Sequence, residues 1–537
     1  MSRCRPLAIC VVVVLAVLAP PAAGAEDTDP RADAAVQVTA TPAATRAHAV
    51  PTVATHPDDP RTIAVAQGDA YAARCTLHVS TDAGLTWTAR PLPDVAEWPR
   101  CNMFASFGPV TGVAFAQDGT LYVVRSGIDP TTYHQRVLLD RTTDLGASFE
   151  TTVLPWVEPD LDAGQFGADA LPTVVADRDE AGRVYVGWMS NNGTWNLSEE
   201  VLEGKEYYWD IKSRPYVSVS DDGGRTFSDP VDVAGDMDGW FSEPHLTVAA
   251  DGAVHAFFGQ NVRPPKDAPE GTLAPPANLW LATSRDGGRT FTQQAIHTRP
   301  AKERDWLSGP SPAFDPATGA LSVVWEETGE GKPMVAFMRS DDGGRTWGEP
   351  VRINDVEPKR EWSYNEMFPS LAVAPNGRLD VAWYDWRNDV AFDPQADENR
   401  WQDVYYSYST DGGRSWAPNI KVTDRAIDRS LGVAETYGVK GPIGLATTDE
   451  AAYVAWDDTR NSNEDTSSQD VYFSRVRFAD PQTLFSTAGA GGDSRALWGA
   501  LGAGAALAVG GLVLLVGTRA ARREPRAAPQ GAEPVVR

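Results

Sequence analysis

The sequence has few cysteines, few histidines and a shortage of positive charge. Its 537 residues include 4 cysteines and 7 histidines, and the histidines show no metal-ligand spacing, so no zinc site is predicted. Lys+Arg number 47 against Asp+Glu 73, which gives a formal net charge of -26. No Lys/Arg-rich run occurs before the C-terminal tail, so nucleic acid is not an expected partner. With 42% hydrophobic residues, the chain is nevertheless globular rather than disordered.

Long apolar runs are confined to the two ends of the chain. At the N-terminus, Arg3 and Arg5 precede an apolar stretch over 7–18, and Ala23-Gly24-Ala25 follows with the small residues that signal peptidase needs. Residues 1–25 are therefore predicted to be a signal peptide, with the mature chain starting near Glu26. A retained membrane anchor is the alternative.

The C-terminal run, Leu497 to Val516, has 20 uncharged residues, which suits one membrane-spanning helix. Four arginines follow it directly: Arg519, Arg522, Arg523 and Arg526. By the positive-inside rule, residues 517–537 form a basic cytoplasmic tail, and the ectodomain, 26–479, lies outside. We therefore expect an exported, single-pass protein of the cell membrane. The glycine-containing segment 480–496 is a flexible stalk on this interpretation.

Removing the two ends makes the net charge more negative and leaves two of the four cysteines. Without seven arginines and two glutamates, 40 basic residues face 71 acidic ones, so the ectodomain carries a net charge near -31. Such a surface repels anionic ligands unless arginines are concentrated locally. Cys75 and Cys101 are the cysteines that remain. A single pair of cysteines in an exported domain indicates a disulfide rather than a metal or catalytic site.

One eight-residue element recurs six times. It reads Ser/Thr-x-Asp-x-Gly-x-Ser/Thr-Trp/Phe and occurs at 80–87, 142–149, 220–227, 284–291, 340–347 and 409–416. Glycine permits positive φ, and the carboxylate and hydroxyl bond to turn backbone, so the element predicts a tight hairpin turn. We assign a structural role to its aspartates: Asp82, Asp144, Asp222, Asp286, Asp342 and Asp411. A catalytic or calcium-binding role is the alternative, but six copies exceed what one active site needs.

A second repeated element lies between these turns. It has strand alternation, Pro-x-h-x-h, where h is hydrophobic, then an Asp/Asn-Gly or similar turn, then h-x-Val-x-Trp. Copies occur at 51–65, 110–124, 172–188, 244–258, 310–325, 369–383 and 442–456. A third strand, such as 403–407, leads into the turn element, and a fourth, such as 420–422, follows it. These units of about 60 residues predict an all-β propeller of four-stranded antiparallel blades.

The chain has seven inner hairpins but six turn elements. The last unit ends after its third strand, 470–474, and lacks a fourth. The segment Val36-Gln37-Val38-Thr39 resembles Ile420-Lys421-Val422-Thr423, so the start of the mature chain can supply the missing strand and leave no open edge. We therefore predict seven blades closed by an N-terminal strand. Six blades plus a separate flap is the alternative.

Turn elements of this kind in four-stranded units resemble the Asp-box (BNR) repeats of the sialidase superfamily, and the resemblance covers roughly residues 35–478. It implies a β-propeller whose box turns lie on one face, with ligands bound by the loops of the opposite face. It implies no single activity, because the superfamily also includes receptors and assembly factors with similar boxes.

Sialidase chemistry, as the resemblance implies it, needs three arginines that clamp the sugar carboxylate, a Tyr nucleophile activated by Glu, and an Asp acid/base. The first arginine stands in an Arg-Ile-Pro motif, where this chain has Ala49-Val50-Pro51. On other inner strands the residue two before proline is Ala170, Ser242, Ser308, Met367 or Lys440. A lysine cannot make the bidentate contact of an arginine, so sialidase turnover is in doubt.

The loops of the face opposite the boxes carry aromatic side chains beside carboxylates and arginines, which is typical of sugar sites. The predicted ligand-binding residues are Trp240, Arg304, Trp306, Trp362, Asp385, Arg387, Asp458 and Arg460. The last four belong to two related motifs at 385–388 and 457–461, for which loop-fixing salt bridges are the alternative. The candidate catalytic pairs are Tyr364 with Glu366 and Tyr437 with Glu435.

Two further loops leave their roles open. The aromatic loop 191–214 could cover a groove or be a blade-edge insertion. The acidic segment 393–398 could bind calcium, and no other cofactor is expected. The sequence thus favours a cell-surface propeller that binds glycans or a protein partner through one face. A glycoside hydrolase, either an atypical exo-sialidase or an enzyme of neutral polysaccharide, is the alternative.

Overall fold

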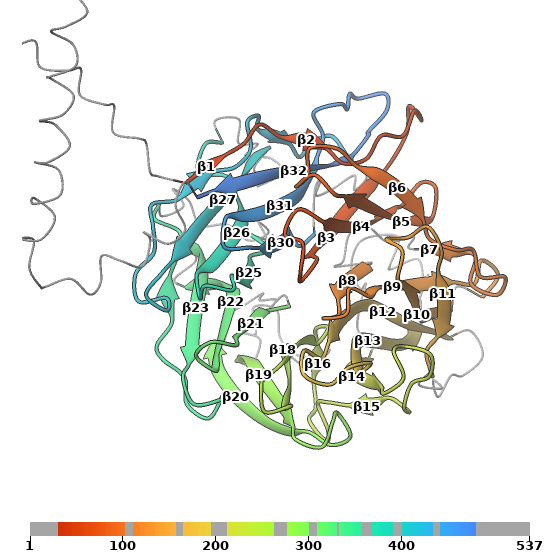
Figure 1. Ribbon diagram of the computed structural model, residues 1–537, viewed down its shortest axis with the longest axis vertical. Coiled ribbons are helices and arrows are strands. Elements are labelled where there is room, and N and C mark those ends of the chain that lie inside the picture. Colours follow the sequence, from red (N-terminus) through yellow and green to blue (C-terminus); the bar gives the residue numbers. More distant parts are fainter. Residues whose placement is uncertain are drawn as a thin grey trace, which may run out of the picture. The chain divides into compact units, whose positions relative to one another are not determined.

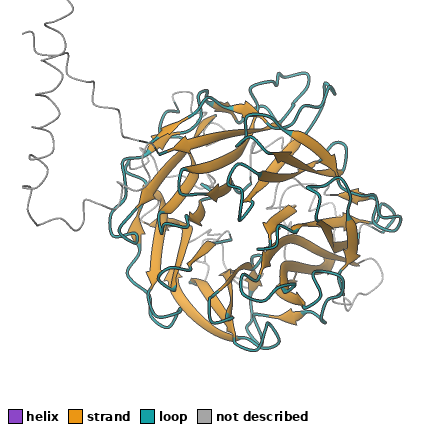
Figure 2. Ribbon diagram, in the orientation of Figure 1, coloured by secondary structure: helices purple, strands orange, loops and turns teal. Residues whose placement is uncertain are grey.

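The computed structural model describes residues 30–101, 111–132, 134–156, 165–194, 212–261, 276–299, 309–329, 332–356, 367–389, 400–432 and 441–478. Within these ranges the chain consists of strands and turns, without a helix (Figure 2). The strands form antiparallel sheets arranged around a common centre (Figure 1). The all-β class and the propeller-like arrangement of antiparallel sheets are confirmed.

Successive strands pair as four-stranded meanders, numbered here in chain order. Meander 1 contains β3 (His48–Thr55), β4 (Ile63–Asp69), β5 (Arg74–Ser80) and β6 (Thr88–Pro91). Meander 2 contains β8 (Thr111–Phe115), β9 (Leu121–Ile128), β10 (Gln135–Thr142) and β11 (Glu150–Val153), with β7 (Arg100–Cys101) beside β9. Meander 3 contains β12 (Gln165–Ala176), β13 (Val184–Thr194), β14 (Lys212–Ser220) and β15 (Val231–Asp232).

The later meanders repeat this order. Meander 4 contains β17 (His245–Val248), β18 (Val254–Asn261), β19 (Ala277–Ser284) and β20 (Thr292–Arg299), with β16 (Trp240–Phe241) on β18. Meander 5 contains β21 (Ser311–Asp315), β22 (Ala320–Gly329), β23 (Lys332–Ser340) and β24 (Val351–Arg352). Meander 6 contains β25 (Ser370–Val373), β26 (Leu379–Asp385), β27 (Trp401–Ser409) and β28 (Ile420–Lys421), with β29 (Ile427–Asp428) on β27. Meander 7 contains β30 (Gly444–Thr447), β31 (Ala451–Asp458) and β32 (Asp470–Arg477).

The first strands of consecutive meanders contact one another in a closed cycle, β3–β8–β12–β17–β21–β25–β30 and back to β3. Hydroxyls next to the inner prolines join neighbours in this cycle. Thr173 Oγ1 donates to the carbonyl of Pro244 at 2.7 Å, and Ser370 Oγ donates to the carbonyl of Ile443 at 2.5 Å. The inner strands therefore hold successive meanders together by direct hydrogen bonds, with Pro-Thr and Pro-Ser at the junctions.

The N-terminal segment completes meander 7. β1 (Arg31–Ala32) and β2 (Val36–Gln37) both pair antiparallel with β32, and Val36 lies opposite Phe473. The expected pairing of the segment that starts at Val36 with the last unit is confirmed. β32 is thereby covered along its outer edge, as an exposed strand edge requires.

The six Asp boxes form hairpin turns with the same hydrogen bonds in each copy. In the first, Gly84 N donates to Ser80 Oγ at 2.8 Å, and Thr86 donates to Asp82 from its amide at 2.9 Å and its hydroxyl at 2.6 Å. The Thr86 hydroxyl is the main cause that lowers the pKa of Asp82 to about 2. Gly84 has φ +84°, and a Cβ there would lie 2.1 Å from the Phe473 ring of meander 7. The aspartates are thus bonded within their own turns, and the box seals the junction with the preceding meander.

The hydrophobic core lies between neighbouring meanders rather than at the centre of the ring. One cluster joins Val65 and Ile63 of β4 to Tyr453 of β31 and Phe473 of β32. The second strands contribute four fully buried indoles: Trp188, Trp325, Trp383 and Trp456. Each such side chain contributes about 2–3 kcal/mol by burial, so these junctions dominate the cohesion of the ring.

The two apolar ends lie outside the described residues. These are the predicted signal peptide, 1–25, and the predicted stalk, span and tail, 480–537. Within the part of the chain that the structure describes, no helix has the length and apolar character needed to cross a bilayer.

Candidate functional site

The motif after β26 ties its own meander together. Asp385 accepts hydrogen bonds from Trp383 Nε1 at 3.1 Å and from Arg387 Nη2 at 2.7 Å. Arg387 also reaches Asp355 at 2.6 Å and Asn419 at 2.9 Å, and its guanidinium lies 4.1 Å from the centre of the Tyr405 ring. This arginine therefore links the second, third and fourth strands to the segment that enters the meander.

The motif after β31 repeats this arrangement. Asp458 accepts from Trp456 Nε1 at 3.0 Å and from Arg460 Nη2 at 2.7 Å. Arg460 pairs with Asp424 at 2.9 Å and lies 4.1 Å from the Tyr472 ring centre. Both guanidinium groups are thus engaged by two carboxylates and an aromatic ring. The geometry matches the loop-fixing interpretation of Asp385, Arg387, Asp458 and Arg460 more closely than ligand binding.

Three inner segments have strained backbone at the residue directly before their proline, one position after the place where the sialidase arginine would stand. Val50, directly before Pro51, has φ 56°, and Leu171 and Phe368 stand before prolines with φ 54° and 43°. Val50 is held by its amide, which donates to Asp457 Oδ1 at 2.9 Å. Burial raises the pKa of Asp457 well above its usual value.

The residues two before these prolines offer no guanidinium. Ala49 and Met367 are 1% exposed, and Ser242 is buried with its hydroxyl accepting from Gly259 N at 2.9 Å. Ala170 is half-buried beside a register shift in β12. Among the described inner strands, therefore, none presents an arginine at this position.

Several predicted site residues lie outside the described ranges. They are Arg304, Trp306, Trp362, Tyr364, Glu366, Glu435 and Tyr437. The acidic segment 393–398 and most of the aromatic loop 191–214 also lie outside them. Trp240 is described: it is half-buried in β16, opposite Asn261 of β18. The catalytic role of the Tyr/Glu pairs therefore stays a prediction.

A cluster that sequence reasoning missed lies on meander 2. It consists of Trp98, His134, Arg136 and Trp156, which we call the tryptophan–arginine cluster. The Arg136 guanidinium carbon lies 3.4 Å from the Trp156 ring centre and 5.5 Å from that of Trp98, and His134 packs 5.6 Å from Trp156. All four side chains are half-buried. Because β10 starts at Gln135 and runs toward the box at 142–149, the cluster lies at the sheet edge opposite the box.

Asp169 of β12 lies next to this cluster. A parallel bridge between Gln135 and Ala168 brings Arg136 alongside Asp169, and the Arg136 charge acts on its carboxyl. The side chain is 4% exposed, and burial raises its pKa to about 6, against the opposing effects of hydrogen bonding and Arg136. Such a carboxyl exchanges protons near neutral pH, as a general acid or base must.

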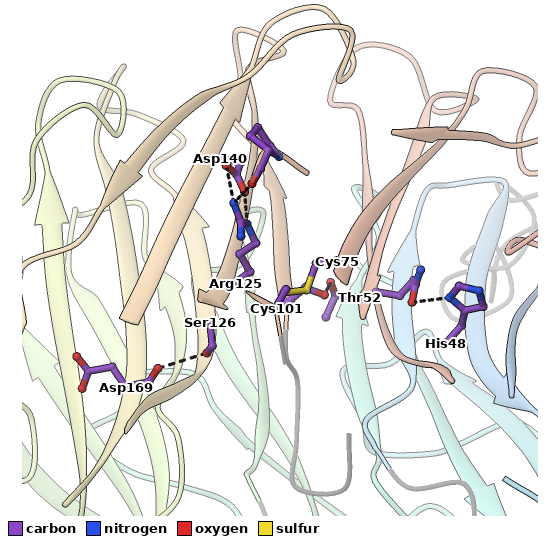
Figure 3. The surroundings of a disulfide bond; sticks show 11 residues. His48, Thr52, Cys75, Cys101, Arg125, Ser126, Asp140 and Asp169 are labelled. Atoms are coloured by element: carbon purple, nitrogen blue, oxygen red, sulfur yellow. Dashed lines mark hydrogen bonds and ion pairs between the residues drawn. A yellow bond between two sulfur atoms is a disulfide. The ribbon is translucent and has the colours of Figure 1, made fainter. Parts of the chain in front are cut away.

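A disulfide supports the segment that carries Trp98. Cys75 of β5 and Cys101 of β7 form a disulfide, with their Cα atoms 5.6 Å apart (Figure 3). β7 also pairs with the end of β9, where a Cβ on Gly127 would lie 2.8 Å from Trp98 Cβ. Figure 3 shows Asp169 beside Ser126, where the Asp169 carbonyl accepts a hydrogen bond from Ser126 Oγ at 3.3 Å. Trp98 is thus held between meanders 1 and 2.

The side-chain types of the tryptophan–arginine cluster can contact a saccharide. Indole faces stack on sugar rings, a guanidinium donates to hydroxyls, and a carboxyl accepts from them. No three His, Cys, Asp or Glu side chains gather as a metal site would need within the described ranges. His245, the first residue of β17, has its Nε2 3.4 Å from a carboxylate oxygen of Glu243.

Comparisons with known proteins find distantly similar solved structures. No protein-family model matches the sequence, and no curated protein matches it either. Among solved structures, a Hadza microbial sialidase, Hz136, is 14% identical with a TM-score of 0.42, covering 78% of this chain and 73% of its own.

Two arabinan-related proteins are similar as well. The α-L-arabinofuranosidase Arb93A from Fusarium graminearum is 13% identical with a TM-score of 0.43, covering 70% of this chain and 98% of its own. An α-L-arabinanase from Penicillium chrysogenum is 10% identical with a TM-score of 0.42, covering 84% and 99%. The Asp-box turns and the closed ring are observed in this chain directly and do not depend on these comparisons.

Proposed function

We propose that the protein is a sialidase-like propeller of seven blades that binds glycans through the face opposite its Asp boxes. Each meander is one blade, and the N-terminal strands complete the last. The signal peptide and the span at 497–516 would place this face outside the cell, anchored by one helix. The tryptophan–arginine cluster and Asp169 form part of the binding surface.

The stacked Arg136 and Trp156 are the observation that supports this proposal. Two half-buried indoles flank one guanidinium at the sheet edge opposite the Asp box, and a buried carboxyl lies next to them. The box aspartates and the Asp/Arg motifs are bonded internally. This cluster therefore offers the ring faces and polar groups that a sugar needs.

Binding of the purified full-length chain to a panel of neutral and acidic oligosaccharides tests the proposal. Trp156→Ala and Arg136→Gln should weaken binding at least about tenfold, which is 1.4 kcal/mol. The control is Trp416→Ala, which changes a box aromatic at the opposite edge and should bind as the unchanged protein does. Saturable binding to a protein but to no glycan would replace glycan with a protein partner.

A glycoside hydrolase is the second candidate, supported by the pKa of Asp169, about 6. Glycosidases that act on neutral sugars use a carboxyl of this kind as their acid/base. Sialidase turnover is less well supported, because Ala49 stands at the first arginine position. Tyr364 with Glu366 and Tyr437 with Glu435 remain the Tyr/Glu pairs to test.

Release of fluorophore from an α-L-arabinofuranoside and from an α-sialoside separates these activities. If arabinofuranoside turnover occurs and Asp169→Asn removes it, the protein is a hydrolase of neutral sugars and not a binding protein. If sialoside turnover occurs and Tyr364→Phe or Tyr437→Phe removes it, the sialidase does. Binding without turnover of either substrate favours our first proposal.

A further inference from the structure

We infer that the junction where the N-terminal segment lies between meanders 7 and 1 is acid-sensitive. Protonation of two buried histidines, His48 and His78, loosens the contact between this segment and β32. We call the junction, at which the two ends of the ring meet, the ring closure. The inference does not depend on the proposed function, because neither histidine belongs to the tryptophan–arginine cluster.

His48 lies where the chain passes from meander 7 to meander 1. It is the first residue of β3, it stands opposite Asp69 of β4, and its amide donates to the carbonyl of Gln469 at 3.1 Å. Gln469, directly before β32, donates in turn from its amide to the carbonyl of Arg46 at 2.9 Å. His48 is 5% exposed, so its imidazole belongs to the interior of the ring closure.

A chain of four hydrogen-bonded side chains leads from the surface into this junction. The hydroxyl of exposed Thr41 lies 2.9 Å from His48 Nε2. His48 Nδ1 lies 3.3 Å from Gln67 Oε1, and Gln67 Nε2 lies 3.3 Å from His78 Nε2. Gln67 and His78 are buried. Thr41 therefore marks the solvent end of the chain and His78 its inner end.

The inner end faces the apolar core of the junction. His78 stands between Val65 of β4 and Ala89 of β6, and directly opposed side chains lie on the same face of a sheet. Val65 packs on that face with Val38 of the N-terminal segment and Phe473 of β32. His78 Nδ1 is buried and has no hydrogen-bond partner among the described residues. A proton added to His78 would place a charge beside hydrophobic side chains.

The chain can accept one added proton and not two. In the orientation observed, the Gln67 amide nitrogen donates to His78 Nε2 and its oxygen accepts from His48 Nδ1, so His48 can be charged while His78 is neutral. If the Gln67 amide turns over, His78 can be charged, but His48 Nδ1 must then accept and its ring must stay neutral. Two charged rings would direct two N–H groups at one amide oxygen, so double protonation breaks the chain.

The charged groups around the two rings are already engaged. Asp69 Oδ2 lies 3.8 Å from His48 Nδ1, while Asp69 Oδ1 accepts from three backbone amides. Asp470 of β32 also favours a charged His48, but it is held by Arg46, whose positive charge opposes one on His48. On His78 the charge that acts is that of His48, which opposes a second proton.

The direction of the pH effect follows from burial. Burial lowers the pKa of His48, and it lowers the pKa of His78 to about 3. An imidazole freed from the junction titrates at about 6.5, so between about pH 6.5 and 3 the open state binds more protons than the closed one. Each such proton raises the opening equilibrium by up to about tenfold per pH unit. The ring closure is therefore stable above this window and loosens as pH falls through it.

The nearby ion pair does not account for loosening at pH 4.5. The pKa of Asp470 lies below its usual value, so its pair with Arg46 remains ionised at that pH. A change between pH 7.5 and 4.5 thus reports on the histidines.

Hydrogen exchange of the full-length chain at pH 7.5 and 4.5, corrected for the intrinsic pH dependence of exchange, tests this inference. Peptides that cover β2, β32 and residues 46–48 should lose protection by about tenfold or more at pH 4.5. Those that cover β22 and β23 of meander 5 should change by less than about threefold. His48→Gln/His78→Gln keeps amide donors and acceptors but removes both titrating rings, and it should reduce the loss at the ring closure to under about threefold.

His255→Gln is the matched control. His255 is 1% exposed, and its Nδ1 lies 3.1 Å from Thr283 Oγ1 in meander 4, away from the ring closure. This change should leave the loss of protection at β2 and β32 as in the unchanged protein.

Thermal unfolding at pH 7.5 shows which variants fold. Where the double variant does not, His78→Gln alone replaces it and should also reduce the loss of protection, since one titrating ring is gone. The inference is overturned if the unchanged protein keeps its protection at the ring closure at pH 4.5. It is also overturned if the folded histidine variant loses as much protection there as the unchanged protein.

Discussion

Arg46 and Asp470 form a two-pronged ion pair across 424 residues of sequence, with Nε and Nη2 each 2.6 Å from a carboxylate oxygen. The arginine lies just before the first inner strand, and the aspartate opens the last strand of the ring. Burial opposes the charge of Asp470, but the hydrogen bonds from Arg46 and Asn461 and the nearby positive charge together outweigh it and lower the pKa of this carboxyl. The pair therefore fastens the two ends of the ring together.

Arg46→Ala should destabilise the protein by about 3 kcal/mol, because it leaves a carboxylate that is 1% exposed without its cation. Urea unfolding measures the loss. Hydrogen exchange should rise in β1, β2 and β32. Since the pair contributes only while Asp470 is ionised, the difference from the unchanged protein should shrink as pH falls through the lowered pKa. An undiminished difference at pH 2, or unchanged exchange in β1 and β2, would contradict a fastening role.

The disulfide should stabilise both the fold and the site. Cys75 and Cys101 enclose a sequence separation of 26, for which the loss of chain entropy in the unfolded state is worth about 3 kcal/mol. Cys75→Ser/Cys101→Ser should lower the free energy of unfolding by that amount, measured in urea without reductant. It should also weaken glycan binding, because β7 holds the segment of Trp98. With reductant present, the unchanged protein should approach the variant. If binding does not change while stability falls, Trp98 is not part of the glycan site.

The box hydroxyls are predicted to contribute to folding and not to ligand binding. Ser220 is buried, accepts from Gly224 N at 2.8 Å and donates to Asp222 at 2.8 Å. Ser220→Ala removes the acceptor of a buried amide and should cost about 1–2 kcal/mol of stability. Ser340→Ala, the same change in another box, should cost a similar amount. Glycan binding measured alongside should remain as in the unchanged protein, and a selective loss in one box would argue for a local function there.

The repeats predicted the fold because each carries its own local chemistry. The Ser-x-Asp-x-Gly spacing specifies a turn whatever surrounds it, and alternating apolar residues specify the strands beside it. The pairing of Val36 with β32 followed from counting strands and from similarity to the strand at 420–422. Local pattern and ring closure agree, so this part of the structure could be predicted.

The candidate site could not be predicted in the same way. Trp98 and Asp169 lie on segments separate from Arg136, and they come close to it because β7 pairs with β9 and because β10 bridges to β12. No spacing in the sequence encodes those two contacts. The motifs at 385–388 and 457–461 were visible as repeats, but the sequence could not decide whether each arginine faces a ligand or the aspartate two residues before it.

Those two motifs should behave as architecture. Arg387→Ala and Arg460→Ala each leave a buried carboxylate, Asp385 or Asp458, without its cation, so each should cost about 2 kcal/mol. Arg285→Ala is the control, since it removes an Arg–Asp pair of similar distance in which both side chains are more than half exposed, and should cost under about 1 kcal/mol. Urea unfolding compares the three. Loss of glycan binding without loss of stability in Arg387→Ala would return that arginine to the ligand site.

We expect ionised Asp169 to lower the stability of the fold, as a carboxyl retained for its chemistry would. Its pKa is about 6 in the folded protein against about 3.9 in an unfolded chain, so the folded state binds more protons between these values. Stability should therefore fall as pH rises from about 4 to 6, by at most about 3 kcal/mol, and stay low above that window. Asp169→Asn removes this penalty.

The variant should be more stable than the unchanged protein at pH 7.5, by up to that amount, and equally stable at pH 4, where both side chains are neutral. Urea unfolding at the two pH values measures this. Asp140→Asn gives the contrast: Asp140 pairs with buried Arg125 at 2.6 Å, so neutralising it should destabilise the protein at pH 7.5. A gain in stability at Asp169 together with lost glycan binding or turnover would mark a carboxyl retained for its chemistry. A loss of stability at pH 7.5 would instead make Asp169 a structural acid.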